Sequence, residues 1–253
     1  MLGLGNNITT TYAAESYLPT SVTGTLEFWV NVKQGVTRSV TGLANDDVHQ
    51  WDDLSSTKKL VRLASNSAPQ IKNSADITAA DPINFLGDTN GDALKLQTSS
   101  NSNTEISLDQ SDGGYTVCFI ATNEALDSET VVFGSFSDDS AGVIWLDGDK
   151  VRFRANGQNF DFNASGINDD DFFSFMIVVH QGSSVNNAKL YINNNAADAK
   201  TITSDFVFGM VGGNNGAPKN FAESRIKQII LYNDAISDSD RNALYTNYIS
   251  PAI

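Results

Sequence analysis

The chain has 253 residues and a formal net charge of −14, from 16 basic and 30 acidic side chains. Nucleic-acid binding needs clustered Lys and Arg that displace counterions from phosphates, so this charge balance excludes it and makes an anionic membrane surface a poor partner. Hydrophobic residues are 40% of the chain and aromatic residues 9%, which excludes a globally disordered chain. The length suits one large all-β domain or two small ones.

The start of the chain carries no targeting or membrane signal. Residues 1–7 lack the basic region and the long apolar run of a secretory signal. No run in the chain approaches the roughly 18 apolar residues that span a membrane, so no membrane insertion is expected. Residues 1–21 show little alternation and are expected to form an N-terminal arm that orders against a partner. We therefore expect synthesis in a cytoplasm and any external role without conventional secretion.

Strand patterns begin after this arm. In residues 25–32, apolar side chains at every second position alternate with Trp29 and Asn31, which indicates a strand with one core face. Further short strands are expected at residues 59–63, 83–86, 93–96, 115–121, 131–136, 143–146, 151–153, 160–162, 172–179, 188–192, 206–211 and 226–232. Asn, Asp, Ser and Gly separate them. The predicted fold is all-β, a two-sheet antiparallel jelly-roll sandwich formed by residues 22–253.

One short helix is expected at the C-terminal end. Ser237 suits the N-cap and Asp240 stands three residues further on, which is a variant of the capping box. Leu244 and Tyr248 then fall on one helical face. Pro251 follows where it cannot extend the helix.

Two stretches carry recognisable motifs. Residues 48–55 read VHQWDDLS and are followed, after a gap, by residues 82–94, PINFLGDTNGDAL. Residues 224–241 read SRIKQIILYNDAISDSDR. Together they resemble the concanavalin A-like (laminin G-like) jelly rolls found in secreted and phage virion proteins. In those, a Trp-x-Asp-x-Ser segment precedes Phe-x-Gly-x-x-Asp-x-Leu, and the last long strand leads into a short helix. Ile236, which stands where Leu is common, is a mild departure.

The opening residues 1–5, MLGLG, also resemble the N-termini of marine bacteriophage structural proteins. The resemblance implies a non-catalytic virion structural protein, a capsid decoration, tail or baseplate component that docks to other virion proteins in repeated copies or as a homo-oligomer. Folding in a reducing host cytoplasm fits the single cysteine, Cys118, which lies in an apolar run. The alternatives are a carbohydrate-binding module for host surface glycans and, less favoured, a polysaccharide hydrolase.

Enzymatic activity is not expected. Glycoside hydrolysis needs two carboxylates across the scissile bond, and related glucanases carry Glu-x-Asp-x-Glu on one strand face. The nearest match is residues 124–129, but its Asp is one position late and the segment reads as a loop.

No cofactor is required by these patterns, but calcium is an open alternative. Asp88, Asn90 and Asp92 have the alternate spacing of a calcium-binding loop. Ala93 stands at its sixth position instead of Gly, and Ser99 at its twelfth instead of an acid. A polar turn is therefore the favoured interpretation.

Glycan binding would use an exposed aromatic ring with Asp and Asn around it. Trp29 lies opposite the apolar face of its strand, and Trp145 is flanked by two apolar residues, so both are candidate glycan-binding residues. Core or interface packing is the commoner role of a single Trp. Trp51 belongs to the family motif and is expected to pack at the sheet edge.

Overall fold

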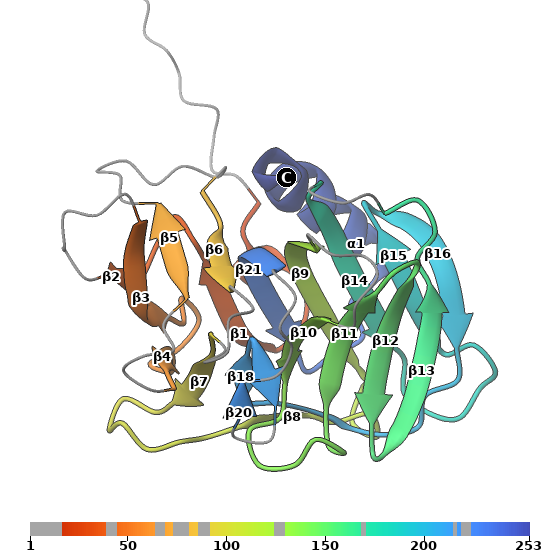
Figure 1. Cartoon of the computed structure of the whole chain (residues 1–253). Coiled ribbons are helices and arrows are strands. Elements are labelled where there is room, and N and C mark those ends of the chain that lie inside the picture. The colour runs from red at the N-terminus through yellow and green to blue at the C-terminus, as the bar shows by residue number, and fades with distance from the viewer. Residues whose placement is uncertain are drawn as a thin grey trace, which may run out of the picture.

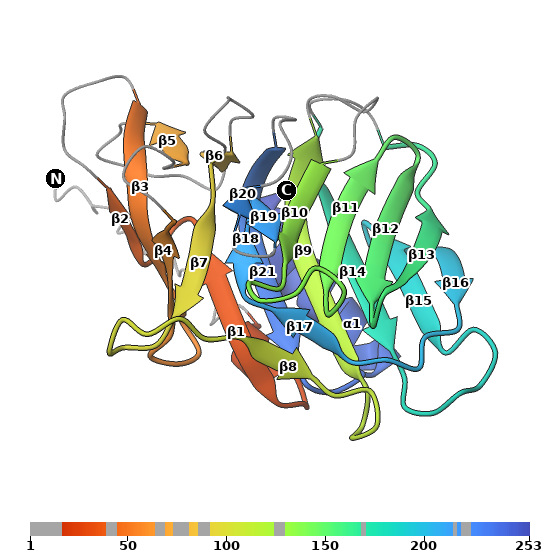
Figure 2. The same cartoon turned by 60° about the horizontal axis from the view of Figure 1, so that its bottom comes forward.

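The computed structural model describes residues 17–38, 45–63, 69–72, 81–85, 92–123, 130–167, 171–214, 217–218 and 224–253. These residues form two antiparallel sheets packed face to face, with one short C-terminal helix on the outer side of one sheet (Figure 1, Figure 2). The predicted all-β sandwich is confirmed. In the described part of the chain, no helix is long and apolar enough to cross a membrane.

The first sheet is built around its two longest strands. β9 (Tyr115–Asn123) pairs with β14 (Phe173–Val179) on one side and with β21 (Ser224–Tyr232) on the other. The other edge of β21 is shared, because β6 (Ile83–Phe85) pairs with its start and β1 (Leu26–Asn31) with the rest. The remaining strands are β15 (Ala188–Ile192), β16 (Asn195–Lys200) and β5 (Gln70–Lys72).

The strand order of the second sheet is β13 (Gln158–Asn163), β12 (Lys150–Ala155), β11 (Val143–Asp147), β10 (Thr130–Gly134), β18 (Met210–Val211), β7 (Leu94–Gln97), β4 (Lys59–Arg62), β3 (Asn45–Asp52) and β2 (Val36–Arg38). The start of β3 also pairs with β5, so this strand joins the two sheets. Two short ribbons complete the fold, β8 (Ile106–Leu108) with β17 (Phe206–Phe208) and β19 (Gly213–Asn214) with β20 (Ala217–Pro218).

The main core lies between the sheets and is rich in phenylalanine. The ring centroid of Phe119 lies 4.9 Å from that of Phe175 and 5.2 Å from that of Phe133. The β8–β17 ribbon closes one end of the sandwich by burying Phe206 and Phe208 completely. Buried aromatic rings contribute large apolar area, so this cluster is the main source of hydrophobic stabilisation.

A second apolar cluster lies on the outer face of the first sheet, under the C-terminal helix. The helix α1 (Asp238–Leu244) continues as a π-helical turn (Tyr245–Ile249) and a 3₁₀ turn (Ser250–Ala252). Leu244 and Ile249 are buried against Cys118 and Ile230 of the sheet. Since β9 is covered on both faces, its continuously apolar sequence is explained.

The helix start is as predicted, but its end is not. The backbone N–H of Asp240 donates to the side chain of Ser237, which is the predicted N-cap. The helical path continues past the predicted end, because Pro251 occupies the first turn of the 3₁₀ segment, where its missing N–H costs nothing.

The expected arm, residues 1–21, is described only from Tyr17. The Tyr17 hydroxyl donates to Asp240 at 3.0 Å, and the Tyr232 hydroxyl donates to the carbonyl of Pro19 at 2.9 Å. The last residues of the expected arm therefore pack against the sandwich, while residues 1–16 lie outside the described residues.

Candidate functional site

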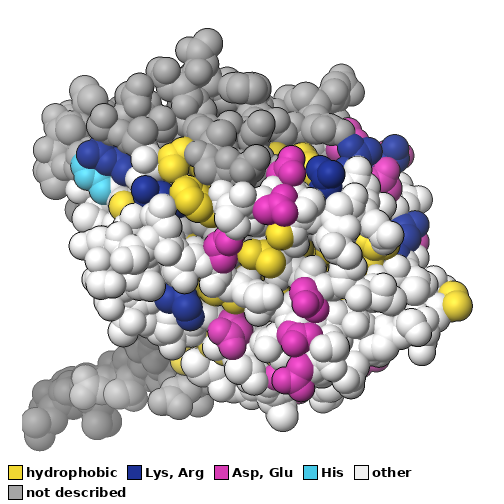
Figure 3. Space-filling model, turned by 90° about the horizontal axis from the view of Figure 1, so that it is seen from below, with side chains coloured by type: hydrophobic (Ala, Val, Ile, Leu, Met, Phe, Trp, Pro, Cys, Tyr) yellow, Lys and Arg dark blue, Asp and Glu magenta, His cyan; other side chains and the backbone are white. Residues whose placement is uncertain are grey.

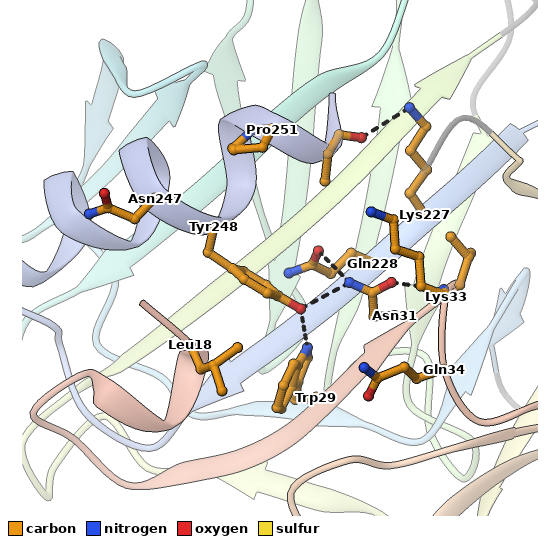
Figure 4. Close-up of a pocket in the computed structure, with 12 residues that line it drawn as sticks. Leu18, Trp29, Asn31, Lys33, Gln34, Lys227, Gln228, Asn247, Tyr248 and Pro251 are labelled. Carbon is orange, nitrogen blue, oxygen red and sulfur yellow. Dashed lines mark hydrogen bonds between the residues drawn. The ribbon is translucent and has the colours of Figure 1, made fainter. Parts of the chain in front are cut away.

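A pocket of about 280 Å³ opens on the outer face of the first sheet, beside the end of the helix (Figure 4). We call it the C-terminal pocket. Its lining residues are Leu18, Trp29, Asn31, Val32, Lys33, Gln34, Lys227, Gln228, Asn247, Tyr248, Pro251 and Ala252. Small-molecule pockets usually enclose roughly 300–1,000 Å³, so this one has room for a single small unit.

The strand period explains how β1 contributes to this pocket. Successive side chains of a strand point to opposite faces. Phe28 and Val30 therefore enter the core, while Trp29, Asn31 and, just beyond the strand, Lys33 come to the outer face.

A β-bulge explains the contribution of β21. The register of β21 against β9 shifts between Ile226 and Gln228. A bulge places two residues of one strand opposite one residue of its neighbour and re-aims a side chain. As a result, the adjacent residues Lys227 and Gln228 both line the pocket.

Asn31 is the centre of a hydrogen-bond network in the pocket (Figure 4). Its Oδ1 accepts from the backbone N–H of Lys33 at 2.9 Å, which identifies Nδ2 as the remaining donor. Nδ2 donates to the Tyr248 hydroxyl at 2.9 Å and to Oε1 of Gln228 at 3.4 Å. The bond from Lys33 thus fixes the orientation of the Asn31 amide, and the bond from Asn31 fixes that of the Gln228 amide.

Tyr248 joins the helix to the strands. Its hydroxyl oxygen also accepts from Nε1 of Trp29 at 2.9 Å, and the two rings meet edge to face at 5.7 Å. Burial raises the pKa of Tyr248 to about 12, although the bonds from Asn31 and Trp29 lower it. The hydroxyl therefore stays protonated at neutral pH.

Lys227 brings a positive charge to the wall of the pocket. Its Nζ donates to the carbonyl oxygens of Ala252 and Ile253 at 3.1 and 2.9 Å, and lies 3.9 Å from the centroid of the Phe172 ring. Burial lowers the pKa of Lys227, and the charges of Arg225 and Lys33 lower it further. These three cations therefore lie close enough to influence one another, in a chain with a net charge of −14.

Trp29 is buried, which agrees with the commoner packing role of a single Trp and not with an exposed glycan platform. Only 8% of the residue is accessible, because Tyr248 of the helix covers the ring and takes its N–H. Trp29 lines the C-terminal pocket with part of its surface and does not offer an open stacking platform.

Trp145 lies elsewhere, on the second sheet. It is half-buried in β11 between Val131 of β10 and Arg152 of β12. Nε of Arg152 donates to Asp161 at 2.7 Å, so an ion pair lies next to the strand position of the ring. The two tryptophan candidates thus belong to different sheets and cannot form one platform.

Of the three calcium candidates, the structure describes Asp92. Asp88 and Asn90 lie outside the described residues, and Asp92 is 9% exposed. In the segments that the structure describes, no group of three or more His, Cys, Asp or Glu side chains could hold a metal ion.

The family motif of residues 48–55 has a structural role. Trp51 is completely buried and donates to the carbonyl of Asn31 at 3.0 Å, and it lies on β3 next to the edge strand β2. Asp53 accepts the backbone N–H of Trp29 at 3.0 Å and that of Ser55 at 2.9 Å. The motif therefore fastens β1, which carries Trp29 and Asn31 of the pocket.

Several pocket residues were not singled out from the sequence. Lys227 and Gln228 look like an irregularity in an apolar strand, which is the usual mark of a bulge, and Gln34 and Asn247 carry no signal. Tyr248 was predicted only as part of an apolar helix face.

Solved toxin binding domains resemble this chain in structure. The binding domain of Paraclostridial Mosquitocidal Protein 1 matches with a TM-score of 0.56 and 18% identity, over 88% of this chain and 52% of that one. The botulinum neurotoxin serotype D ligand binding domain, solved with N-acetylneuraminic acid, gives 0.54 and 14% over 91% and 53%. The Trypanosoma rangeli sialidase, solved with 2,3-difluorosialic acid, gives 0.51 and 10% over 86% and 32%. A scan of protein-family models and a search of curated proteins find no match.

At these identities the likeness shows the fold alone, a β-sandwich of the type found in toxin binding domains. The chain spans about half the length of those domains and about a third of the sialidase. What they bind is a property of those proteins.

Proposed function

We propose that the protein is a non-catalytic carbohydrate-binding module and that the C-terminal pocket holds the sugar. The observation that carries this proposal is that four side-chain amides line one small cavity together with the Tyr248 ring and the accessible part of Trp29. Sugars offer apolar C–H faces and paired hydroxyls, and side-chain amides both donate and accept hydrogen bonds. The serotype D toxin domain and the sialidase were each solved with a sialic acid or its derivative, which supports the same class of ligand.

The first test is a glycan array followed by titration of the best sugar. Gln34 and Asn247 are exposed at the pocket, so Gln34→Ala with Asn247→Ala removes sugar contacts without disturbing the core. Each lost hydrogen bond is worth about 1 kcal/mol, so we expect the affinity to fall about tenfold or more. Asn159→Ala, an exposed site on β13, is the matched control and should bind normally.

Trp145→Ala tests whether the sugar binds at Trp145 on the second sheet instead of in the C-terminal pocket. If Trp145→Ala abolishes binding while the double pocket variant binds normally, the sugar site lies on the second sheet. If no glycan binds at all, the proposed function fails.

The virion role implied by the sequence resemblance remains a second proposal. Tyr17 and Pro19 hold the chain to the sandwich, so a docking segment before them would start from a fixed point. Deletion of residues 1–16 should reduce incorporation into particles, and unchanged incorporation would contradict a docking role for this segment. The toxin domains and the sialidase give no support to this role.

A non-catalytic role is also part of the proposal. Glu105, one of the glutamates in the described part of the chain, holds a loop by four hydrogen bonds, which is a structural role. Incubation with the best-bound glycan should release no reducing ends. Sustained release would assign a hydrolase instead.

A further inference from the structure

Two hydrogen-bond donors of the C-terminal pocket have no partner among the described residues. The Tyr248 oxygen accepts from both Trp29 and Asn31, which uses both of its lone pairs. Its own proton remains to be donated, and among the described residues no acceptor takes it.

Gln228 adds a second donor. Its Oε1 accepts the bond from Asn31, so its Nε2 points away from Asn31 (Figure 4). Gln228 is only 1% exposed, and its buried Nε2 has no hydrogen-bond partner in the described part of the chain. A buried donor without a hydrogen-bond partner is destabilising, which favours a ligand that brings an acceptor.

The charges around the pocket also favour a ligand that brings acceptors, and in particular an anion. Of the residues that the structure describes, its lining includes Lys33 and Lys227 but no Asp or Glu. Lys33 is exposed at the rim. By contrast, the groove beside β8 and β17 is lined by Asp205, and the face seen in Figure 3 carries many acidic side chains.

We infer that the C-terminal pocket selects an acidic sugar, a sugar unit that carries a carboxylate. This inference rests on the proposed function. A carboxylate has two oxygens and about four acceptor positions, so it can take hydrogen bonds from Tyr248 and Gln228 together. Lys33 and Lys227 then supply the compensating charge, and charge-assisted bonds are about twice as strong as neutral ones.

The test compares sugars that differ only in charge. A galacturonic acid trimer and sialyllactose are each titrated against their methyl esters, with lactose and acetate as further probes. We expect each acid to bind at least about tenfold more tightly than its ester. Acetate should not compete at matched concentrations, because it lacks the sugar.

Two variants test the residues. Lys33→Glu should weaken the acids about tenfold and leave the esters unchanged, whereas Lys189→Glu, an exposed control on β15, should change neither. Gln228→Glu keeps the bond from Asn31 but replaces the free donor with a negative oxygen, so acid binding should be lost. Thermal unfolding of Gln228→Glu confirms that it folds.

The outcomes separate this inference from the proposed function. Equal binding of acids and esters overturns the inference but leaves carbohydrate binding in place. Tighter binding of sulfated sugars, or competition by acetate alone, also overturns it. Failure of every sugar to bind overturns both.

Discussion

Glu105 shows what one carboxylate contributes to this fold. It accepts from the Ser135 hydroxyl and the Phe136 N–H at 2.6 Å, and from the N–H and hydroxyl of Ser137 at 3.0 and 2.6 Å. Burial alone would raise the pKa of Glu105, but these bonds outweigh burial and lower it below its ordinary 4.5. We predict that Glu105→Gln destabilises the protein at neutral pH, by about 1–2 kcal/mol after allowance for partial exposure.

The pH dependence gives the control for this prediction. Because the pKa is lower in the folded chain, the carboxylate stabilises the fold above its unfolded pKa, and this contribution is lost as the pH falls through the folded pKa. Urea unfolding at about pH 7 and about pH 3.5 should therefore show a difference between wild type and Glu105→Gln that shrinks with acid. A difference that does not change with pH would contradict the role given to the charge.

The pocket residues mark the limit of what the sequence could predict at this scale. Alternation placed Trp29 and Asn31 on the same face of their strand, and the structure confirms this. The ring that covers Trp29 belongs to Tyr248, which is 219 positions away in the chain. Local patterns carry no information about such a contact, so the sequence could not decide between an exposed and a packed Trp29.

The C-terminal helix is the element on which the pocket depends. Its first turn is held by the Ser237 cap, and Asp240 also accepts the bond from Tyr17. We predict that Ser237→Ala costs about 1 kcal/mol, which for a domain of this size lowers Tm by about 2–4 °C. Thr246→Ala, at an exposed position of the following π-helical turn, is the control and should change Tm little. Equal effects of the two variants in thermal unfolding would contradict the cap.

The strands divide by how apolar their sequences are. β9, β14 and β21 were predicted because long runs of β-branched and aromatic residues are typical of central strands, and these residues are indeed buried. β16 was missed, because Asn195–Lys200 is polar, half-exposed and paired on one side with β15. In the turn between β15 and β16, Asn193 and Asn194 adopt positive φ angles of 47° and 67°, which asparagine tolerates better than most residues. Edge strands of this kind are stabilised by their neighbours, which a local pattern does not show.

At the scale of the whole molecule, the excess negative charge is unevenly distributed. Acidic side chains such as Asp138 and Asp205 are exposed in the connections, whereas Arg225, Lys227 and Lys33 come together near the C-terminal pocket. The composition alone predicted a poor partner for anions. The fold limits that conclusion, because it brings these three cations together near the C-terminal pocket. Among the described residues, no Asp or Glu lines this pocket.

This separation predicts opposite responses of stability and binding to salt. Like charges destabilise a compact chain, and the Debye length falls from about 30 Å at 0.01 M to about 8 Å at 0.15 M salt. Over this range of NaCl, Tm should therefore rise, because repulsion within a chain of net charge −14 is screened. The affinity for an acidic sugar should fall over the same range, because the attraction of Lys33 and Lys227 is screened as well. Near the isoelectric point of about 4.3 the response of Tm should disappear. If Tm and affinity instead change in the same direction, the net charge and the pocket charge are not separated as the structure indicates.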